Sequence, residues 1–430
     1  MGSANRMRQV SALVSRLDDP CIIVLSAVAG TTNSLTDICD SARKGKKEEC
    51  AELVLDLEHY YFSYIKELYT TDSAHTSGHE RVAKSFKLLR ELLDTPFNIV
   101  RDKEILSLGE LLSTRLFYEL LISQNMDPVW LNALDFMRTR NGEPVHQLIE
   151  SSISTILQQH IGHDIYITQG FICKNEEGEV DNLKRGGSDY TASILGAAVG
   201  ASEIQIWTDI DGMHNNDPRV VQKTVPVHAL SFDEAAELAY FGAKILHPST
   251  IHPAKRNNIP VRLLNTMEPD AKGTLISNNT SAGANKVKAV AAKDGITAIN
   301  IKSHRMLMAH GFLRKVFEIF ERSNTSIDMI TTSEVAMSVT IDDTSNLENI
   351  IAELSVFSQV HVDEDQTIVC VVGEFSKNEA GIGVRILESL AQIPIRMISS
   401  GGSESNISVL IDTAYKKKAL ELLNAHLFGL

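Results

Sequence analysis

Residues 182–201, NLKRGGSDYTASILGAAVGA, combine the side chains whose types and spacing best suit chemistry. Gly186 and Gly187 permit a ligand to approach the backbone closely, and a helix predicted to start at Ser188 offers unpaired N–H groups and the positive end of its dipole. Arg185 adds a cation whose fork geometry suits a carboxylate or a phosphate. The stretch predicts an anion site, but a surface turn capped by Ser188 explains the same residues equally well.

Polar residues in three other stretches favour the anion site. LSAVAGTTN, residues 25–33, places small and hydroxyl side chains at the end of a buried strand, although a simple β-to-α turn explains these residues equally well. IWTDIDGMHNNDPR, residues 206–219, follows a strand with acidic side chains that suit a ribose or a hydrated cation, although turns also favour Asp, Asn and Gly. Lys244 lies in the apolar run FGAKILHPST, where an unpaired ammonium is costly, so we expect it to meet a bound anion or an internal ion-pair partner.

Glu110 is a candidate of a different kind, because it lies on a predicted helix. In SLGELLSTRLFYELLISQN, residues 107–125, it shares a helix face with Thr114, Phe117 and Leu121. We therefore expect its carboxylate to be half-buried. Such a carboxylate either pairs internally or binds a cationic ligand, and the sequence favours neither.

The elements that would position these residues follow an α/β pattern over the first 280 residues or so. The runs CIIVLSAV, DIYITQGFI and EIQIWTDIDG each read as a strand followed by a turn, with long helical patterns between them. This alternation predicts a mostly parallel sheet with helices on both faces and ligands at the carboxyl ends of the strands. The polar segment 269–290 is a plausible domain boundary.

The remainder of the chain repeats itself at an interval of seventy residues. Gly311 aligns with Gly381, and SEVAMSVTID, residues 333–342, aligns with SESNISVLID, residues 403–412. Each copy pairs an amphipathic helix with a strand of alternating apolar residues. The C-terminal third is therefore predicted to be two copies of one small α+β module. A purely architectural or dimerising pair is the alternative to a ligand-binding one.

Composition excludes several classes of function. The net charge of −14 argues against nucleic-acid and membrane partners, and no apolar run approaches the roughly 20 residues of a membrane helix. No secretory signal opens the chain. The five cysteines are scattered without a C-x-x-C pair, which predicts reduced thiols in a cytoplasmic protein and no metal site built on them.

Together these motifs resemble the aspartokinases of the amino-acid kinase superfamily. The resemblance rests on LSAVAGTTN, SLGELLST, ITQGFI, RGGSDYTA, WTDIDG, NDPR, FGAKILHP, GFLRKVFEIF and IDMITTSEV, in that order. It implies an α/β catalytic domain over 1–282 with a mostly parallel open sheet and helices on both faces. Two α+β ferredoxin-like ACT modules would follow over 283–365 and 366–430, and a strand near 287–301 is a candidate for sharing with the second module.

The resemblance further implies phosphorylation of the L-aspartate side-chain carboxylate to 4-phospho-L-aspartate, the first step of lysine, threonine and methionine biosynthesis. ATP would be the donor and would itself carry Mg²⁺, with no separate protein metal site. Arg185 would clamp the aspartate α-carboxylate, Glu110 would meet its amino group, and Asp189 would organise the catalytic centre together with Arg185. The rest of the substrate pocket would be Ser26, Thr32, Gly186, Gly187 and Ser188. The nucleotide site would comprise Thr208, Asp209, His214, Arg219, Lys244 and Ile245; His214 stands where the family pattern has a tyrosine.

An amino-acid effector is implied for the first module. The positions that match lysine-inhibited members are Met306, Gly311, Leu313, Ile327, Asp328, Thr332, Ser333 and Glu334, while Ala309 replaces an expected serine. A helix beginning near Gly311 would receive the effector carboxylate, and Asp328 with Glu334 would receive its ammonium groups. L-lysine is the first choice of effector and threonine the second. ACT modules of this kind predict a homodimer or a tetramer.

The chain departs from the family pattern at its start. The family opens with a strand reading Lys-Phe-Gly-Gly-Thr-Ser-Val, whereas MGSANRMRQV resembles the family segment just after that strand. A truncation and a mis-assigned start are both compatible with this, and we expect the 430-residue chain to have little kinase activity and an unpaired sheet edge. Two other functions remain open, namely a superfamily kinase for another carboxylate, such as glutamate or acetylglutamate, and a non-catalytic amino-acid sensor.

Overall fold

The strand-and-turn runs of the first 210 residues form parallel strands in a computed structural model. The structure describes residues 2–183, 186–242, 246–278, 286–303, 311–375 and 380–430. Arg185, Lys244, Ile245 and Met306 lie outside these ranges. The chain divides into a first unit, Met1–Ile210 with Ser249–Ala271, and a second unit, Asp211–Pro248 with Lys272–Leu430.

Two groups of parallel strands organise the first unit. Strand β1 (Cys21–Leu25) pairs with β5 (Ile165–Gln169), which pairs with β2 (Pro128–Trp130), so β1 is an edge strand in the order β1-β5-β2. Strand β8 (Ile204–Thr208) pairs in parallel with β10 (Val261–Asn265). Two short antiparallel hairpins join β3 (Thr139–Arg140) to β4 (Glu143–Pro144) and β6 (Ile172–Lys174) to β7 (Val180–Asn182).

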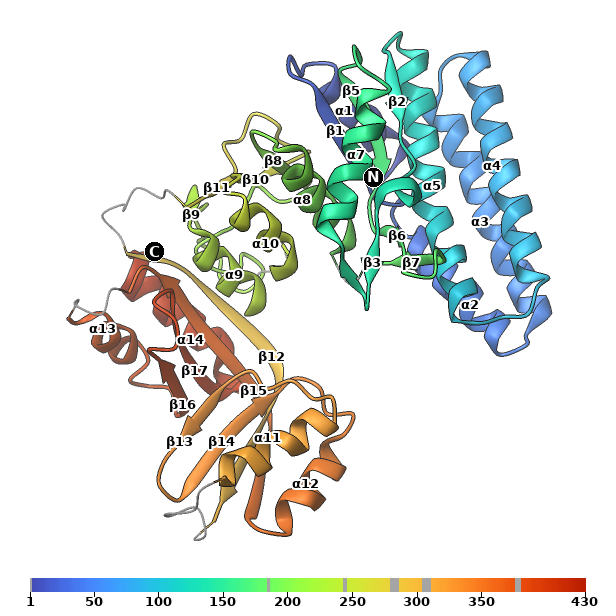
Figure 1. Ribbon diagram of the computed structural model, residues 1–430. Helices are drawn as coiled ribbons and strands as arrows, with labels where there is room; N and C mark the ends of the chain where they lie inside the picture. Colours follow the sequence, from blue (N-terminus) through green and yellow to red (C-terminus); the bar gives the residue numbers. More distant parts are fainter. Residues whose placement is uncertain (1, 184–185, 243–245, 279–285, 304–310, 376–379) are drawn as a thin grey trace. The chain divides into compact units, whose positions relative to one another are not determined.

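Helices surround these strands. They are α1 (Ala4–Val14), α2 (Thr31–Arg43), α3 (Lys47–Leu68), α4 (Asp72–Leu93), α5 (Ile99–Ser123), α6 (Ala133–Phe136), α7 (His146–Gln158), α8 (Gly187–Val199) and α10 (Pro248–Arg256), the last beginning at the boundary between the units. Helices α3, α4 and α5 lie side by side, and buried residues such as Tyr61, Phe86 and Phe117 form the core among them (Figure 1).

Capping residues set the limits of the two helices that matter for the site. Helix α5 begins earlier than the predicted residue 107, because the Asn98 side chain accepts a hydrogen bond from the Arg101 N–H and starts the helix at Ile99. Helix α8 begins at Gly187 rather than Ser188. Its N-cap is Gly186, with a φ of 75° that favours glycine, so Ser188 lies in the first turn instead of capping it.

The second unit is built on a six-stranded antiparallel sheet. The order is β13 (Ile330–Thr332), β14 (Ala336–Ile341), β12 (Val287–Lys302), β15 (Gln359–Gly373), β17 (Asn406–Asp412) and β16 (Ile395–Ser400). Helices α11 (Phe312–Arg322), α12 (Leu347–Ser355), α13 (Ile382–Ser389) and α14 (Lys416–Leu423) accompany it, with a 3₁₀ turn at Thr413–Tyr415 and a π-helical turn at Asn424–Phe428. Strands β9 (Ala229–Leu230) and β11 (Thr274–Ile276) pair in parallel, and α9 (Phe232–Tyr240) packs on β12 and β15.

The seventy-residue repeat is visible in this sheet. Gly311 and Gly381 are the N-caps of α11 and α13, with φ values of 85° and 95°. The long strand β12 contributes to the cores of both copies: Val287 and Val290 pack with the second, and Ile299 and Ile301 with the first. The predicted fold class, a mostly parallel α/β sheet followed by two α+β modules, is confirmed.

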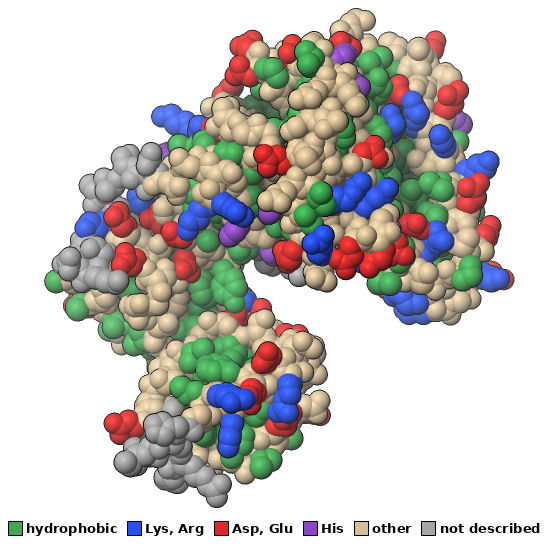
Figure 2. Space-filling view, in the orientation of Figure 1, with side chains coloured by type: hydrophobic (Ala, Val, Ile, Leu, Met, Phe, Trp, Pro, Cys, Tyr) green, Lys and Arg blue, Asp and Glu red, His purple; other side chains and the backbone are tan. Residues whose placement is uncertain are grey.

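The surface carries both signs of charge, which are interspersed over the face drawn in Figure 2. Among the described residues, no helix combines the length and the apolar character that crossing a membrane requires.

Candidate active site

A cavity of about 250 Å³ in the first unit brings together residues from four separate segments. It is lined by Ser26, Thr32, Glu110, Phe171, Gly186, Gly187, Ser188 and Asp189. Apart from Arg185, which lies outside the described residues, this set contains every position predicted for the substrate pocket and the catalytic centre. Phe171 is the one lining residue that the sequence reading missed.

The fold explains why these segments meet. Ser26 follows β1 directly, and Phe171 lies just beyond β5, the neighbouring parallel strand. Because the carboxyl ends of parallel strands share one edge of a sheet, both residues lie at that edge. Thr32 comes from the first turn of α2 and Gly187 from the first turn of α8, so two helix N-termini also reach the cavity.

Glu110 enters the cavity from the middle of α5 and is more buried than predicted. Its exposed fraction is 3%, not one half, because Gly109 lets the helix approach the loop after β1: a Cβ at Gly109 would lie 2.9 Å from the Ala27 Cβ. The Ala27 N–H donates to Glu110 Oε1 at 3.2 Å, while Oε2 has no hydrogen-bond partner in the described part of the chain. Burial raises the pKa of Glu110 to about 7.

Hydroxyl groups lock α5 against the strands on either side of Glu110. The Ser113 hydroxyl donates to the Ser26 carbonyl at 2.7 Å. Thr114 Oγ1 accepts from Gln169 Nε2 at 2.9 Å and from Trp130 Nε1 at 3.1 Å. These bonds fix the position of the carboxylate relative to the edge of the sheet.

A tight turn after β5 places Phe171 against the N-terminus of α8. Phe171 has a φ of 67°, which is uncommon for a residue with a side chain. Thr191 Oγ1 accepts from the Phe171 N–H at 3.1 Å and donates to the Gly187 carbonyl at 2.8 Å, which ties the turn to the helix. Gly170 is required here, since a Cβ would lie 2.5 Å from Ser188 Cβ.

Asp189 adds a second carboxylate to the first turn of α8, and burial raises its pKa to about 6. The N–H groups of that turn point away from the helix and can receive an anion. The cavity thus combines anion-binding N–H groups with a buried carboxylate that has one unbonded oxygen. Such a combination suits a ligand that carries both charges, such as an amino acid.

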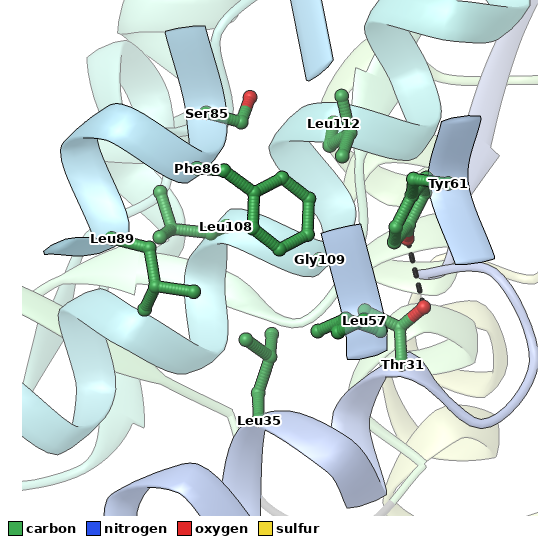
Figure 3. Close-up of a pocket in the computed structure, with 10 residues that line it drawn as sticks. All are labelled: Thr31, Leu35, Leu57, Tyr61, Ser85, Phe86, Leu89, Leu108, Gly109 and Leu112. Carbon is green, nitrogen blue, oxygen red and sulfur yellow. Dashed lines mark hydrogen bonds between the residues drawn. The ribbon is translucent and has the colours of Figure 1, made fainter. Parts of the chain in front are cut away.

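A second, mostly apolar cavity lies beside Gly109, the residue before Glu110 on α5 (Figure 3). This cavity of about 20 Å³, space for roughly one water molecule, lies among α2–α5, and Gly109, Leu112 and Phe86 are among the residues that line it. A hydrogen bond of 2.8 Å joins Thr31 Oγ1 to the Tyr61 hydroxyl at its edge. This space is too small for a ligand.

The residues predicted for the nucleotide fall into both units. In the first unit, Thr208 ends β8 and its hydroxyl donates to Asp209 Oδ1 at 3.3 Å. In the second unit, His214 Nε2 lies 2.8 Å from Asp211 Oδ1, and His214 Nδ1 lies 2.9 Å from Thr224 Oγ1.

Arg219, also in the second unit, makes two bonds to Asp217, at 2.9 and 2.8 Å, and its side chain is 68% exposed. Lys244 and Ile245 lie outside the described residues. The roles of these nucleotide-site residues stay predictions.

The residues predicted for the effector lie in the second unit. Gly311 caps α11 and Leu313 is exposed on it; Ile327 is half-buried; Thr332, Ser333 and Glu334 are exposed at the β13–β14 turn. Asp328 differs from expectation. Its side chain is 1% exposed and already accepts a bond from the Lys293 ammonium at 2.8 Å, so it is not an unpaired carboxylate.

Metal-binding groups are sparse in what the structure describes: within those residues no three His, Cys, Asp or Glu side chains gather in a way that could hold an ion. The five cysteines are free thiols. Burial raises the pKa of Cys21 to about 11, so this thiol stays protonated near neutral pH.

Comparisons with known proteins agree with this geometry. The model of the amino acid kinase family matches residues 1–265. The lysine-sensitive aspartokinase 3 of Escherichia coli is 33% identical over 419 residues, which cover 95% of this chain and 92% of that protein. This chain belongs to the aspartokinases. A chloroplastic aspartokinase 3 of Arabidopsis thaliana is 32% identical and covers 100% of the chain and 80% of its own length.

Solved structures extend this result to the fold. The crystal structure of E. coli aspartokinase III in complex with aspartate and ADP matches with a TM-score of 0.85 and 32% identity, over 99% of this chain and 97% of that one. The complex of the same enzyme with lysine and aspartate gives a TM-score of 0.80. An ACT-domain model matches residues 369–427, within the second copy of the repeat. The predicted family and the aspartate kinase activity are thus confirmed.

Proposed function

We propose that the 250 Å³ cavity is the site where this aspartate kinase binds L-aspartate and where ATP phosphorylates its side-chain carboxylate to 4-phospho-L-aspartate. The observation that carries the assignment is Glu110 Oε2, a buried carboxylate oxygen without a partner among the described residues. A buried acceptor of this kind is costly unless a ligand completes it. The ammonium group of an amino acid supplies both the missing donor and the opposite charge.

The other end of the substrate meets α8. Its first-turn N–H groups, at Gly187 and Ser188, receive a carboxylate of aspartate, and Arg185 clamps the α-carboxylate as the family resemblance implies. Asp189 helps to hold the cations around the transferred phosphoryl group. Phosphoryl transfer depends mainly on positioning and charge neutralisation, which a rigid cavity of this composition provides.

The nucleotide is ATP, and Mg²⁺ accompanies it on the phosphates. The E. coli neighbour was solved with aspartate and ADP, which supports an adenine nucleotide as the second ligand. Asp189 lies in the first turn of α8, at the substrate cavity, and Asp209 directly follows β8, in the predicted nucleotide site. These two carboxylates are the ones best suited to bind water molecules of a hydrated Mg²⁺.

A substrate panel tests the reaction. The 430-residue chain is assayed with ATP and Mg²⁺ on L-aspartate, L-glutamate and N-acetylglutamate, by ADP release, and its affinity for L-aspartate is measured by calorimetry. We expect binding and phosphorylation of aspartate alone. Preference for either other carboxylate, or no binding of aspartate, would refute the assignment. The low turnover expected from the sequence stays a prediction, which the same assay measures.

Feedback inhibition by L-lysine through the first module is the second part of the proposal. The E. coli relative is named lysine-sensitive, and one of its structures contains lysine, which supports this effector for the chain. Titration of lysine and threonine against kinase activity distinguishes the two amino acids. Indifference to both would refute feedback through this module.

Self-association completes the proposal. Leu313, Phe317 and Ile330 are apolar and exposed on α11 and β13. We propose that they take part in a homodimer or a larger assembly. Sedimentation analysis of the chain tests this, and a monomer at micromolar concentration would contradict it.

A further inference from the structure

Four side chains form a polar cluster in the second unit, defined here as the Lys293 cluster. Asp328 is buried and Lys293 largely so, while Tyr240 and Asp342 are partly exposed. The Lys293 ammonium, from β12, lies 2.8 Å from Asp328 Oδ1 and 2.9 Å from Asp342 Oδ2. It also lies 4.5 Å from the centre of the Tyr240 ring. The Tyr240 hydroxyl donates to the same Asp328 Oδ1 at 2.6 Å.

The two oxygens of Asp328 are in different situations. Oδ1 receives both donors, while Oδ2 is buried and has no hydrogen-bond partner within the described ranges. Burial lowers the pKa of Lys293, but its bonds to the two aspartates outweigh this and leave the pKa raised, so the ammonium stays charged. Burial and the bond to Asp328 raise the pKa of Tyr240, so its hydroxyl stays a donor.

The cluster joins the predicted effector residue to helix α9. Tyr240 is the last residue of α9, within the part of the chain that matches the amino acid kinase family, and it directly precedes the motif FGAKILHP. Gly242, with a φ of 122°, packs on the strand beside Lys293: a Cβ there would lie 2.3 Å from the Ala292 carbonyl oxygen. One turn earlier, Glu237 accepts a bond from Asn406 of the second module.

We propose that the Tyr240–Asp328 hydrogen bond transmits effector occupancy of the first module to α9 and the motif after it. Lys293 is a positioning residue, because it holds Asp328 so that only Oδ2 remains for the ammonium of an effector. This inference rests on the proposed effector site and names its route to the catalytic part of the chain.

Charge explains how the link changes state. An effector ammonium at Oδ2 places a second cation beside the carboxylate that already neutralises Lys293, and like charges repel. Lys293 has an alternative acceptor in Asp342, which is half exposed and already bonded to it. The effector ammonium and Lys293 then compete for the Asp328 carboxylate. The hydrogen bond that Asp328 accepts from the Tyr240 hydroxyl weakens, and the end of α9 is released. An effector can shift the equilibrium between the bonded and the released α9 only because it binds one of these two arrangements more tightly than the other.

Tyr240→Phe removes one hydroxyl and leaves the ring that packs against Lys293. Hydrogen–deuterium exchange of peptides covering 232–242 is measured with and without saturating L-lysine, and lysine affinity is measured by calorimetry. In the unmodified chain we expect lysine to speed exchange in α9 by about fivefold or more. In Tyr240→Phe, lysine still binds within about threefold, but the response of α9 is lost. Tyr415→Phe, a partly exposed tyrosine outside the cluster, should behave like the unmodified chain.

Each other outcome counts against the proposal in its own way. A full response of α9 in Tyr240→Phe would overturn the link while leaving the effector site intact. Loss of lysine binding in that variant would show that the hydroxyl serves affinity instead of transmission. If neither lysine nor threonine binds the unmodified chain, the proposed effector site fails and the link fails with it.

Discussion

Glu110 and Asp328 are both buried carboxylates, but no cation pairs with Glu110 among the described residues, whereas Lys293 pairs with Asp328. Glu110 Oε1 bonds only to a backbone N–H and Oε2 to nothing described, and its pKa is raised to about 7. Asp328 Oδ1 meets the Lys293 ammonium and the Tyr240 hydroxyl. Burial is therefore a poor guide to role, because the partner decides whether the charge stabilises the fold.

The contrast fits the general pattern of functional sites. A carboxylate that opposes folding is retained where a ligand completes it, and other contacts offset its cost. Around Glu110 those contacts are the bond that the Ser113 hydroxyl donates to the Ser26 carbonyl and the bond that the Thr114 hydroxyl accepts from Gln169, which hold α5 in place. At Asp328 the cation is internal, so an effector ammonium at Oδ2 has to share the carboxylate with Lys293.

The largest effect is expected from Glu110→Gln. Gln keeps the shape but removes the charge that would meet the substrate ammonium, so affinity for L-aspartate should fall by about 100-fold. Glu104→Gln is the matched control on the same helix; its ion pair with Arg101 is partly exposed, and it should change affinity by less than about twofold. Calorimetry measures both. Equal affinities in the two variants would remove Glu110 from the substrate site.

The stabilities of Glu110→Gln and Asp328→Asn should change in opposite directions. The folded-state pKa of Glu110 lies above its unfolded value of 4.5, so the folded protein binds more protons and loses stability as pH rises through about 7. At pH 8, Glu110→Gln should therefore raise the free energy of unfolding by about 2 kcal/mol, and near pH 4 by almost nothing. Asp328→Asn should lower it by about 3 kcal/mol, because Lys293 loses its buried partner.

Chemical denaturation at both pH values measures these changes, with the transitions of the two units fitted separately. If the free energy of unfolding changed with the same sign in Glu110→Gln and Asp328→Asn, the contrast between the two carboxylates would be wrong.

A smaller effect is expected from Thr191→Val. The substitution removes both bonds by which Thr191 joins Phe171 to Gly187, at 3.1 and 2.8 Å. We expect the KM for aspartate to rise by about fivefold, with a loss of stability of about 1 kcal/mol. Thr155→Val is the control, since its hydroxyl bonds only within the exposed face of α7. An unchanged KM would show that the turn tolerates movement.

The smallest effect is expected from Lys103→Met. Lys103 on α5 lies 2.6 Å from Asp181 of β7, the strand that leads to the glycine turn, but the pair is partly open to solvent. Affinity for aspartate should fall by about twofold. Lys87→Met, on an exposed face of α4, should have no effect. A tenfold loss in Lys103→Met would mean that the hairpin is held far less firmly than the structure suggests.

The sequence predicted the segments of the site better than their contacts. Motifs at residues 25–33, 107–114 and 186–189 contained all but one lining residue, because strand ends and helix starts are legible in local patterns. Phe171 was missed, although it lies in the motif ITQGFI. Its φ of 67° and its approach to Gly187 depend on tertiary contact, and a phenylalanine gives no local sign of a positive φ.

Long-range pairings account for the other differences. The full burial of Glu110 depends on Gly109 meeting Ala27, more than eighty residues away in sequence. Asp328 was expected to await an effector, but its partners Lys293 and Tyr240 come from β12 and α9. By contrast, the repeat of Gly311 and Gly381 was legible because both residues cap the same helix in each copy.

Calorimetric titration of the unmodified chain with L-aspartate at pH 6 and pH 8 tests the central claim most directly. If the substrate ammonium meets the Glu110 carboxylate, binding should be about tenfold stronger at pH 8, where a group of pKa about 7 is mostly ionised. Glu110→Gln keeps Asp189 and should lose this difference. Equal affinity at both pH values in the unmodified chain, or the same tenfold change in the variant, would contradict the account.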